Sequence, residues 1–161
     1  MGVAGVGKTA VGKRVAGELG LPFHDADDFH PEANRQKMAA GVPLTEADRQ
    51  PWLEELARRM TGWEAEGGAV VACSALRRRH RKLLDAASPG AVRFVFLDAP
   101  EEVVRARLAT RRGHYMPASQ LDSQLATLGR PGPDEAVSVD ASGEADETAA
   151  AVLAALSSAR R

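Results

Sequence analysis

Residues Gly2-Val3-Ala4-Gly5-Val6-Gly7-Lys8-Thr9 fill every fixed position of the phosphate-loop pattern G-x-x-x-x-G-K-[ST]. The glycines let successive backbone N–H groups turn toward a β-phosphate without clashes from Cβ atoms. Lys8 can reach the β- and γ-phosphate oxygens, and the Thr9 hydroxyl can ligate magnesium. A chance match in a chain of this length has a probability of roughly half a per cent. The segment therefore predicts binding of a nucleoside triphosphate.

A helix is expected directly after this loop. Val11, Val15 and Leu19 recur at i, i+4 and i+8 and form an apolar stripe. The unpaired N–H groups and positive dipole end of a helix N-terminus add to an anion site. We therefore expect the nucleotide to be held by Gly5, Val6, Gly7, Lys8, Thr9 and Ala10.

The strand that normally leads into a phosphate loop has no sequence here, because only Met1 precedes Gly2. Either the chain starts further upstream, or added residues supply the strand, or the fold lacks it. The third alternative would leave the two neighbouring strands with unpaired backbone groups in the core. We expect about five to eight extended residues before Met1.

Length and composition indicate a single globular domain. The chain has 161 residues, 44% of them hydrophobic and 27% charged, and no apolar run long enough for a membrane span. The single cysteine, Cys73, allows no internal disulfide and suits the cytoplasm. A net charge of −1 gives no general attraction for nucleic acid or anionic lipid.

The order of the expected elements predicts an α/β domain with a parallel sheet covered on both faces, because extended segments alternate with helices. The extended segments are 21–24, 69–73, 92–98 and 137–139, and the helices are 31–40, 45–66, 76–86, 101–112, 119–128 and 149–156.

Charged residues follow the expected strands, where ligands of parallel sheets gather. Asp25 and Asp27 alternate by two, so extended backbone would turn both toward the same side. One carboxylate can hold magnesium and the other can orient or deprotonate an attacking hydroxyl, although a solvated acidic turn is the alternative. Arg107 and Arg111 share one helix face before Gly113, which favours either a lid that closes on the phosphoryl group or an exposed basic face.

Several longer stretches resemble the bacterial gluconate kinases, the gluconokinases of the thermoresistant type. The matching runs keep the same order over most of the chain, from Gly2 to about Asp140. Arg78 departs from the pattern, since many relatives have lysine there. The runs are Asp25-Ala26-Asp27-Asp28-Phe29-His30-Pro31, Asn34, Lys37-Met38, Gly41-Val42-Pro43-Leu44, Asp48-Arg49, Pro51-Trp52-Leu53, Cys73-Ser74-Ala75-Leu76-Arg77, Arg107-Leu108, Arg111, Gly113-His114-Tyr115-Met116, Leu128, Pro131-Gly132 and Asp134-Glu135.

The resemblance implies ATP- and Mg²⁺-dependent transfer of a phosphoryl group to the 6-hydroxyl of D-gluconate. It implies one P-loop kinase domain over residues 1–161, related to shikimate kinase, with a five-stranded parallel sheet in the order 2-3-1-4-5. Substrate-binding helices would lie at about 31–66 and a lid at about 111–128. By the same likeness, Asp27 would lie near the acceptor hydroxyl, Asp25 in the magnesium shell, Arg107 near adenine and Arg111 at the phosphates, and relatives suggest a homodimer.

Gluconate has one carboxylate and many hydroxyls, so its site needs a cation fork and several hydrogen-bonding groups. Arg77 offers the planar bidentate geometry. The two histidines named next could instead be structural, and the asparagine and lysine could belong to an exposed helix face. Further polar residues in segments expected to line the acceptor side are His30, Asn34, Lys37, Arg49 and His114.

Two other functions remain open from the sequence. A related kinase could use another acceptor such as shikimate, although the stretch from His30 to Trp52 argues against it. A nucleotide-binding regulatory module would need no acceptor pocket, and Arg49, Arg77 and His114 would then be idle surface.

Overall fold

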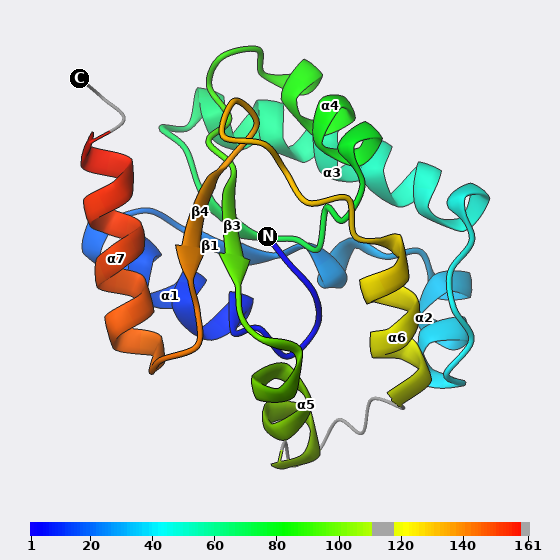
Figure 1. Ribbon diagram of the computed structural model, residues 1–161. Coiled ribbons are helices and arrows are strands. Elements are labelled where there is room, and N and C mark those ends of the chain that lie inside the picture. The colour runs from blue at the N-terminus through cyan, green and yellow to red at the C-terminus, as the bar shows by residue number, and fades with distance from the viewer. Residues whose placement is uncertain (111–117, 159–161) are drawn as a thin grey trace.

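The computed structural model describes residues 1–110 and 118–158, and in these ranges short strands alternate with helices (Figure 1). The expected α/β organisation is confirmed. None of the helices in these two ranges has the length and apolar content to cross a membrane. The strands are β1 (Phe23–Asp25), β2 (Val70–Ala72), β3 (Val95–Asp98) and β4 (Val137–Asp140). The helices are α1 (Lys8–Leu19), the 3₁₀ turn η1 (Ala26–Phe29), α2 (Glu32–Ala39), α3 (Glu46–Ala65), α4 (Arg78–Ala87), α5 (Glu101–Thr110), α6 (Ala118–Thr127) and α7 (Ala145–Ser158).

The strands form two parallel pairs. β1 pairs with β2, which sets Asp25 opposite Ala72, and β3 pairs with β4. Met1 lies between the pairs, near the centre of the molecule (Figure 1): its nitrogen donates to Val95 O at 2.6 Å and its carbonyl accepts from Leu97 N at 2.9 Å. Since Gly2 N also donates to Ser74 O, the phosphate loop begins beside the ends of both β2 and β3.

Two apolar clusters fix the helices around these strands. One cluster joins α1, α5, α6 and α7 to β3 and β4 through residues such as Val11, Val104, Leu121 and Val152. The other joins α3 and α4 to the end of β2, with Trp52, Leu53, Leu56 and Leu84 at its centre. Burying these side chains positions the helix ends that carry the charged residues of the site.

The helix starts follow local sequence rules. Thr45 and Asp48 form a capping box at the start of α3: the Thr45 hydroxyl accepts from Asp48 N, and Thr45 N donates to the Asp48 carboxylate. Gly7 caps α1 in the left-handed conformation, with φ of 105°. Cys73 is buried at the end of β2, and burial raises the pKa of its thiol to about 11.

One local expectation was wrong. The strand expected at 21–24 begins two residues later, at Phe23, and Asp25 and Asp27 do not both lie on extended backbone. The Asp25 carboxylate accepts from Asp27 N at 3.2 Å, which turns the chain into η1 directly after the strand. Asp25 is therefore the last strand residue, and Asp27 lies in the 3₁₀ turn.

Candidate active site

The phosphate loop has the backbone geometry that its glycines allow. Gly2, Gly5 and Gly7 have φ values of 143°, 81° and 105°, in the region that favours glycine. A Cβ atom at Gly5 would lie 2.7 Å from the Cγ of Leu108, so a side chain at this position would also be blocked by α5. The loop thus turns tightly into the N-terminus of α1, as a phosphate cradle requires.

Two side chains of this loop lie where the motif predicts. Lys8 Nζ donates to Val3 O at 2.9 Å, so the ammonium folds back over the loop. Thr9 Oγ1 donates to Asp25 Oδ2 at 2.9 Å, which joins the start of α1 to the end of β1.

The Thr9 and Asp25 pair fits a magnesium ion. A hydroxyl and a carboxylate are hard oxygen ligands, and Mg²⁺ usually takes one or two protein oxygens with the remainder from phosphates and water. No group of three or more His, Cys, Asp or Glu side chains that could hold a metal occurs within residues 1–110 and 118–158. The donor set is therefore one that needs nucleotide oxygens to complete it.

Beyond β1, Asn34 fixes the protonation of His30. Asn34 Nδ2 donates to Asp48 O at 2.7 Å and lies 3.2 Å from His30 Nδ1. An amide nitrogen only donates, so Nδ1 accepts and the ring proton lies on Nε2. That Nε2 is 3.8 Å from Asp27 Oδ1, too long for a hydrogen bond.

His30 is held neutral in a buried setting. It is 5% exposed and stacks on the Trp52 ring with centroids 4.2 Å apart. Burial, then the charges of Arg49 and Arg35, lowers its pKa to about 4. Since Asn34 is 3% exposed as well, both residues build the wall behind Asp27.

Lys37 is paired within the protein. Its Nζ donates to Asp48 Oδ1 at 2.7 Å, while the other oxygen of the same carboxylate serves Thr45. The hydrogen bond from Lys37, with those from Thr45, lowers the pKa of Asp48 to about 2. Asn34 contacts the carbonyl of the same Asp48, so the side chains of Lys37 and Asn34 lie on one side of α2, with Asn34 buried and not part of an exposed face.

Cations gather where α3 and α4 begin. Arg77 Nε lies 3.2 Å from Glu46 Oε1, Arg79 pairs with the same carboxylate, and His80 Nε2 lies 2.9 Å from Oε2. Burial would raise the pKa of Glu46, but His80, Arg79 and Arg77 outweigh it and hold the pKa below its usual value. Arg49 interacts electrostatically with Glu46, Arg77 and Arg79, so the Glu46 carboxylate has more positive than negative charge around it.

Comparisons with known proteins identify the family of this chain. The model of the shikimate kinase family matches residues 4–156. A curated gluconokinase from Gluconobacter oxydans is 46% identical over 147 residues, which cover 89% of this chain and 80% of that protein. The chain belongs to the gluconokinase family.

Solved structures extend that result. A gluconokinase from Sinorhizobium meliloti superposes with a TM-score of 0.90 at 42% identity, covering 98% of this chain and 89% of that one. Shikimate kinase from Aquifex aeolicus, at 17% identity and a TM-score of 0.67, shares the fold alone. The P-loop kinase class expected from the sequence is thereby confirmed.

Arg107, expected near adenine, holds backbone carbonyl groups in this gluconokinase-family chain. Its guanidinium donates to Ala141 O at 2.7 Å, to Ser142 O at 3.0 Å and to Gly143 O at 2.6 Å, with a longer contact to Val6 O. It therefore ties the phosphate loop to the β4–α7 connection. Arg111 and His114, which were expected at the phosphates and the acceptor, lie outside the described residues.

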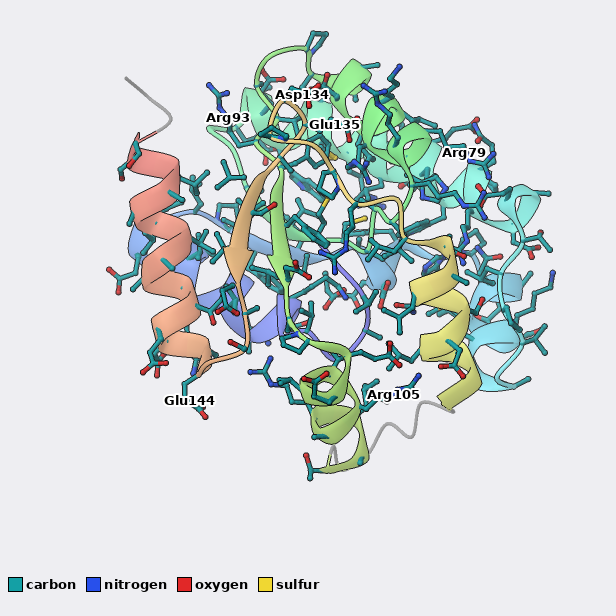
Figure 2. The ribbon with its side chains drawn as sticks, viewed as in Figure 1. Arg79, Arg93, Arg105, Asp134, Glu135 and Glu144 are labelled. Atoms are coloured by element: carbon teal, nitrogen blue, oxygen red, sulfur yellow. The ribbon has the colours of Figure 1, made fainter. Side chains whose placement is uncertain are left out.

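Sequence reasoning missed Arg81 and Glu135. Arg81 is 4% exposed, and its guanidinium donates to Glu135 Oε2 at 2.6 Å and to Ala75 O at 3.1 Å. Figure 2 shows Glu135 on the loop that approaches α4. Because Ala75 has a φ of 42°, unusual for a residue with a side chain, this clamp holds the bend that precedes Arg77.

Gln124 was also missed, although it contacts the phosphate loop itself. Its Oε1 accepts from Ala4 N at 2.7 Å across 120 residues of sequence. Hydrophobic periodicity in the sequence does not single out one glutamine on a helix.

Proposed function

We propose that this chain transfers the γ-phosphoryl group of ATP, with Mg²⁺, to the 6-hydroxyl of D-gluconate. The relatives that match over most of their length are named gluconokinases. One observation carries the proposal: Asp25 pairs with Ala72, and Gly2 N donates to Ser74 O. The phosphate loop, the aspartates and the segment leading to Arg77 therefore leave adjoining chain ends and can serve two substrates at once.

On the donor side, we propose that Gly5, Val6, Gly7, Lys8, Thr9 and Ala10 bind the phosphates. Thr9 and Asp25 would hold the magnesium ion, which draws charge from the transferring phosphoryl group. Lys8 would stabilise the same charge, and Arg111 would join it. Arg107 supports the nucleotide end of the site through the carbonyl groups it holds.

On the acceptor side, we propose that Asp27 orients the 6-hydroxyl and takes its proton. The bond from that oxygen to the γ-phosphorus forms, the bond to the β–γ bridging oxygen breaks, and ADP leaves. The exposed Asp27 carboxylate lies beside the buried His30, whose neutral ring adds no positive charge next to it.

Arg77 would bind the gluconate carboxylate together with Arg49. The Arg77 Nε is buried and forms no aligned hydrogen bond with a described residue, despite its short distance to Glu46. A ligand carboxylate could satisfy this donor in the bidentate geometry that Glu46 does not provide. Lys37, His30, Asn34 and His114 would complete the polar lining.

We further propose that the sheet has five parallel strands. A cavity of about 700 Å³ separates the strand pairs, lined by residues of both facing strands such as Val71 and Val95. A central strand leading into Met1 would fill this space. If that strand is counted as the first and β1–β4 as the second to fifth, the order of the sheet is 2-3-1-4-5. We also propose a cytoplasmic homodimer, which sedimentation analysis would test.

A coupled assay of ADP release tests the function. The purified chain is given MgATP with D-gluconate, with shikimate or with no acceptor. Turnover with gluconate far above both other conditions is expected. Turnover with shikimate alone would favour a related kinase, and release that no acceptor changes would favour a regulatory ATP-binding module.

A further inference from the structure

We propose that Gln124 is a γ-phosphoryl-side positioning residue, which binds the terminal phosphate of ATP through its amide nitrogen while its amide oxygen is anchored on the phosphate loop. The proposal rests on the donor half of the proposed function. It does not depend on which acceptor is phosphorylated.

The position of Gln124 on α6 is unusual for a polar side chain. Leu121, Leu125 and Leu128 recur at i, i+4 and i+7 and pack in the same cluster as Val3 of the phosphate loop. Gln124 adjoins this apolar stripe, where a carboxamide needs a polar partner. It finds that partner in Ala4 N.

The chemistry of this contact orients the amide. A backbone N–H only donates, so the atom that faces Ala4 must be Oε1. The two N–H groups of Nε2 then remain, and no residue within the described ranges accepts a hydrogen bond from them. Such a neutral, directed donor suits an oxygen on which charge accumulates.

The same peptide unit locates the contact along the nucleotide. Its carbonyl, Val3 O, accepts from Lys8 Nζ, and its N–H is the one that Gln124 holds. The lysine of this motif reaches the β- and γ-phosphates, whereas the helix start that carries Thr9 lies at the magnesium ion. Because a trans peptide directs its N–H and C=O to opposite sides, Gln124 and Lys8 approach this unit from opposite faces. The proposal is that Gln124 is coupled through this one peptide to the Lys8 end of the cradle, where ATP and ADP differ.

The helix that carries Gln124 is held in place from a second side. Arg105 of α5 pairs with both Glu101 and Asp122, and Figure 2 shows its side chain reaching from α5 toward α6. Together with the buried Leu121, this contact fixes α6 against the loop. A donor fixed in this way costs little reorganisation when the phosphoryl group moves.

Calorimetric titration with ADP and with the non-hydrolysable adenylyl imidodiphosphate, both with Mg²⁺, tests the proposal without any acceptor. Gln124→Met keeps the length of the side chain but removes both hydrogen-bonding groups. We expect it to weaken binding of the triphosphate about tenfold and to leave ADP within about twofold. Gln124→Glu keeps an oxygen for Ala4 N but replaces the donors by negative charge, so the triphosphate should lose more than in Gln124→Met.

Gln120→Met is the matched control, because Gln120 lies one turn earlier and its hydrogen bond within the described part of the chain is a 3.5 Å contact with Met38 O. It should leave both affinities unchanged. Equal losses for the two nucleotides in Gln124→Met would overturn the proposal and show that Gln124 only satisfies the loop. Unchanged affinities would overturn it too. A split between the nucleotides without gluconate turnover would uphold it and reject the proposed acceptor.

Discussion

The proposed donor and acceptor halves of the site are built by different means. The donor half consists of eight consecutive residues, 2–9, whose shape comes from backbone and glycine, with Asp25 added from the next strand. The acceptor half consists of side chains from α2, α3 and α4 that already hold one another, as in the pairs of Lys37 with Asp48 and Arg77 with Glu46. We therefore expect donor binding to fill a preformed cradle, and acceptor binding to displace the Arg77 pair with Glu46 while Lys37 stays on Asp48.

The strongest test of this difference removes the charge of the donor half. Lys8→Ala should lower kcat about a hundred- to thousandfold, because the lysine acts mainly on charge that develops during transfer. Steady-state kinetics with gluconate would measure it. Lys13→Ala, on an exposed part of the same helix, should change kcat by less than about twofold. A loss of similar size in both variants would mean that the helix, not the ammonium, was disturbed.

In the acceptor half, Arg77→Ala should raise the gluconate KM about tenfold or more while the ATP KM stays nearly constant. The same kinetics with each substrate varied in turn provides the measurement. Arg93→Ala is the charge-matched control, since Arg93 is exposed near the opposite end of β3 (Figure 2). Parallel changes in both KM values would assign Arg77 to the fold instead of the acceptor site.

Trp52, on which His30 stacks, can be tested with a substitution that removes one hydrogen bond and keeps most of the packing. Trp52 Nε1 donates to the carbonyl of the fully buried Ala26 at 2.8 Å. Trp52→Phe leaves that carbonyl without its partner and should lower the free energy of unfolding by about 1–2 kcal/mol. Urea denaturation measures this, and Trp63→Phe on the same helix should cost less because Trp63 is only half-buried. Equal costs would show that lost packing volume dominates.

The buried His30 makes stability depend on pH. Its pKa is about 4 in the folded protein and near 6.5 when unfolded. Between these values the unfolded chain binds the extra proton, so stability should fall as the pH drops from 6.5 to 4. Calorimetric Tm values measure the slope, and His30→Phe should flatten it. His80, whose pKa is also lowered chiefly by burial, leaves a residual slope. An unchanged slope in His30→Phe would exclude His30 as its source.

The smallest effect is expected at Lys37. Because its ammonium is committed to Asp48 and partly exposed, Lys37→Met should change the gluconate KM by less than about threefold and stability by less than about 1 kcal/mol. Acceptor kinetics and urea denaturation would measure both. A KM increase above about tenfold would show that Lys37 leaves Asp48 to bind the substrate. Acceptor binding would then exchange this ion pair as well as that of Arg77 with Glu46.

The features that sequence predicted are those encoded locally. The phosphate loop, the Thr45 capping box and the order of strands and helices follow from residues within a few positions of one another. The hydrogen bond of Thr9 to Asp25 was within reach as well, because parallel strands place their ends at one edge.

The features that sequence missed join distant parts of the chain. Arg81 and Glu135 are 54 residues apart, and the Arg107 carbonyl contacts span about 35. Periodicity reports which face of an element is buried, but not which polar side chain meets which backbone group. For Asp27, the Asx-type hydrogen bond from its own backbone outweighed the extended pattern.

Asp48 has a consequence for how this site can change during evolution. Its two carboxylate oxygens serve Lys37 and Thr45, and its carbonyl serves Asn34. A replacement of this side chain would remove the partner of a lysine and of a helix cap at once, in the segment whose backbone carbonyl holds Asn34. Mutational effects at these positions should therefore be non-additive, so a new acceptor preference would need several coordinated substitutions in this region.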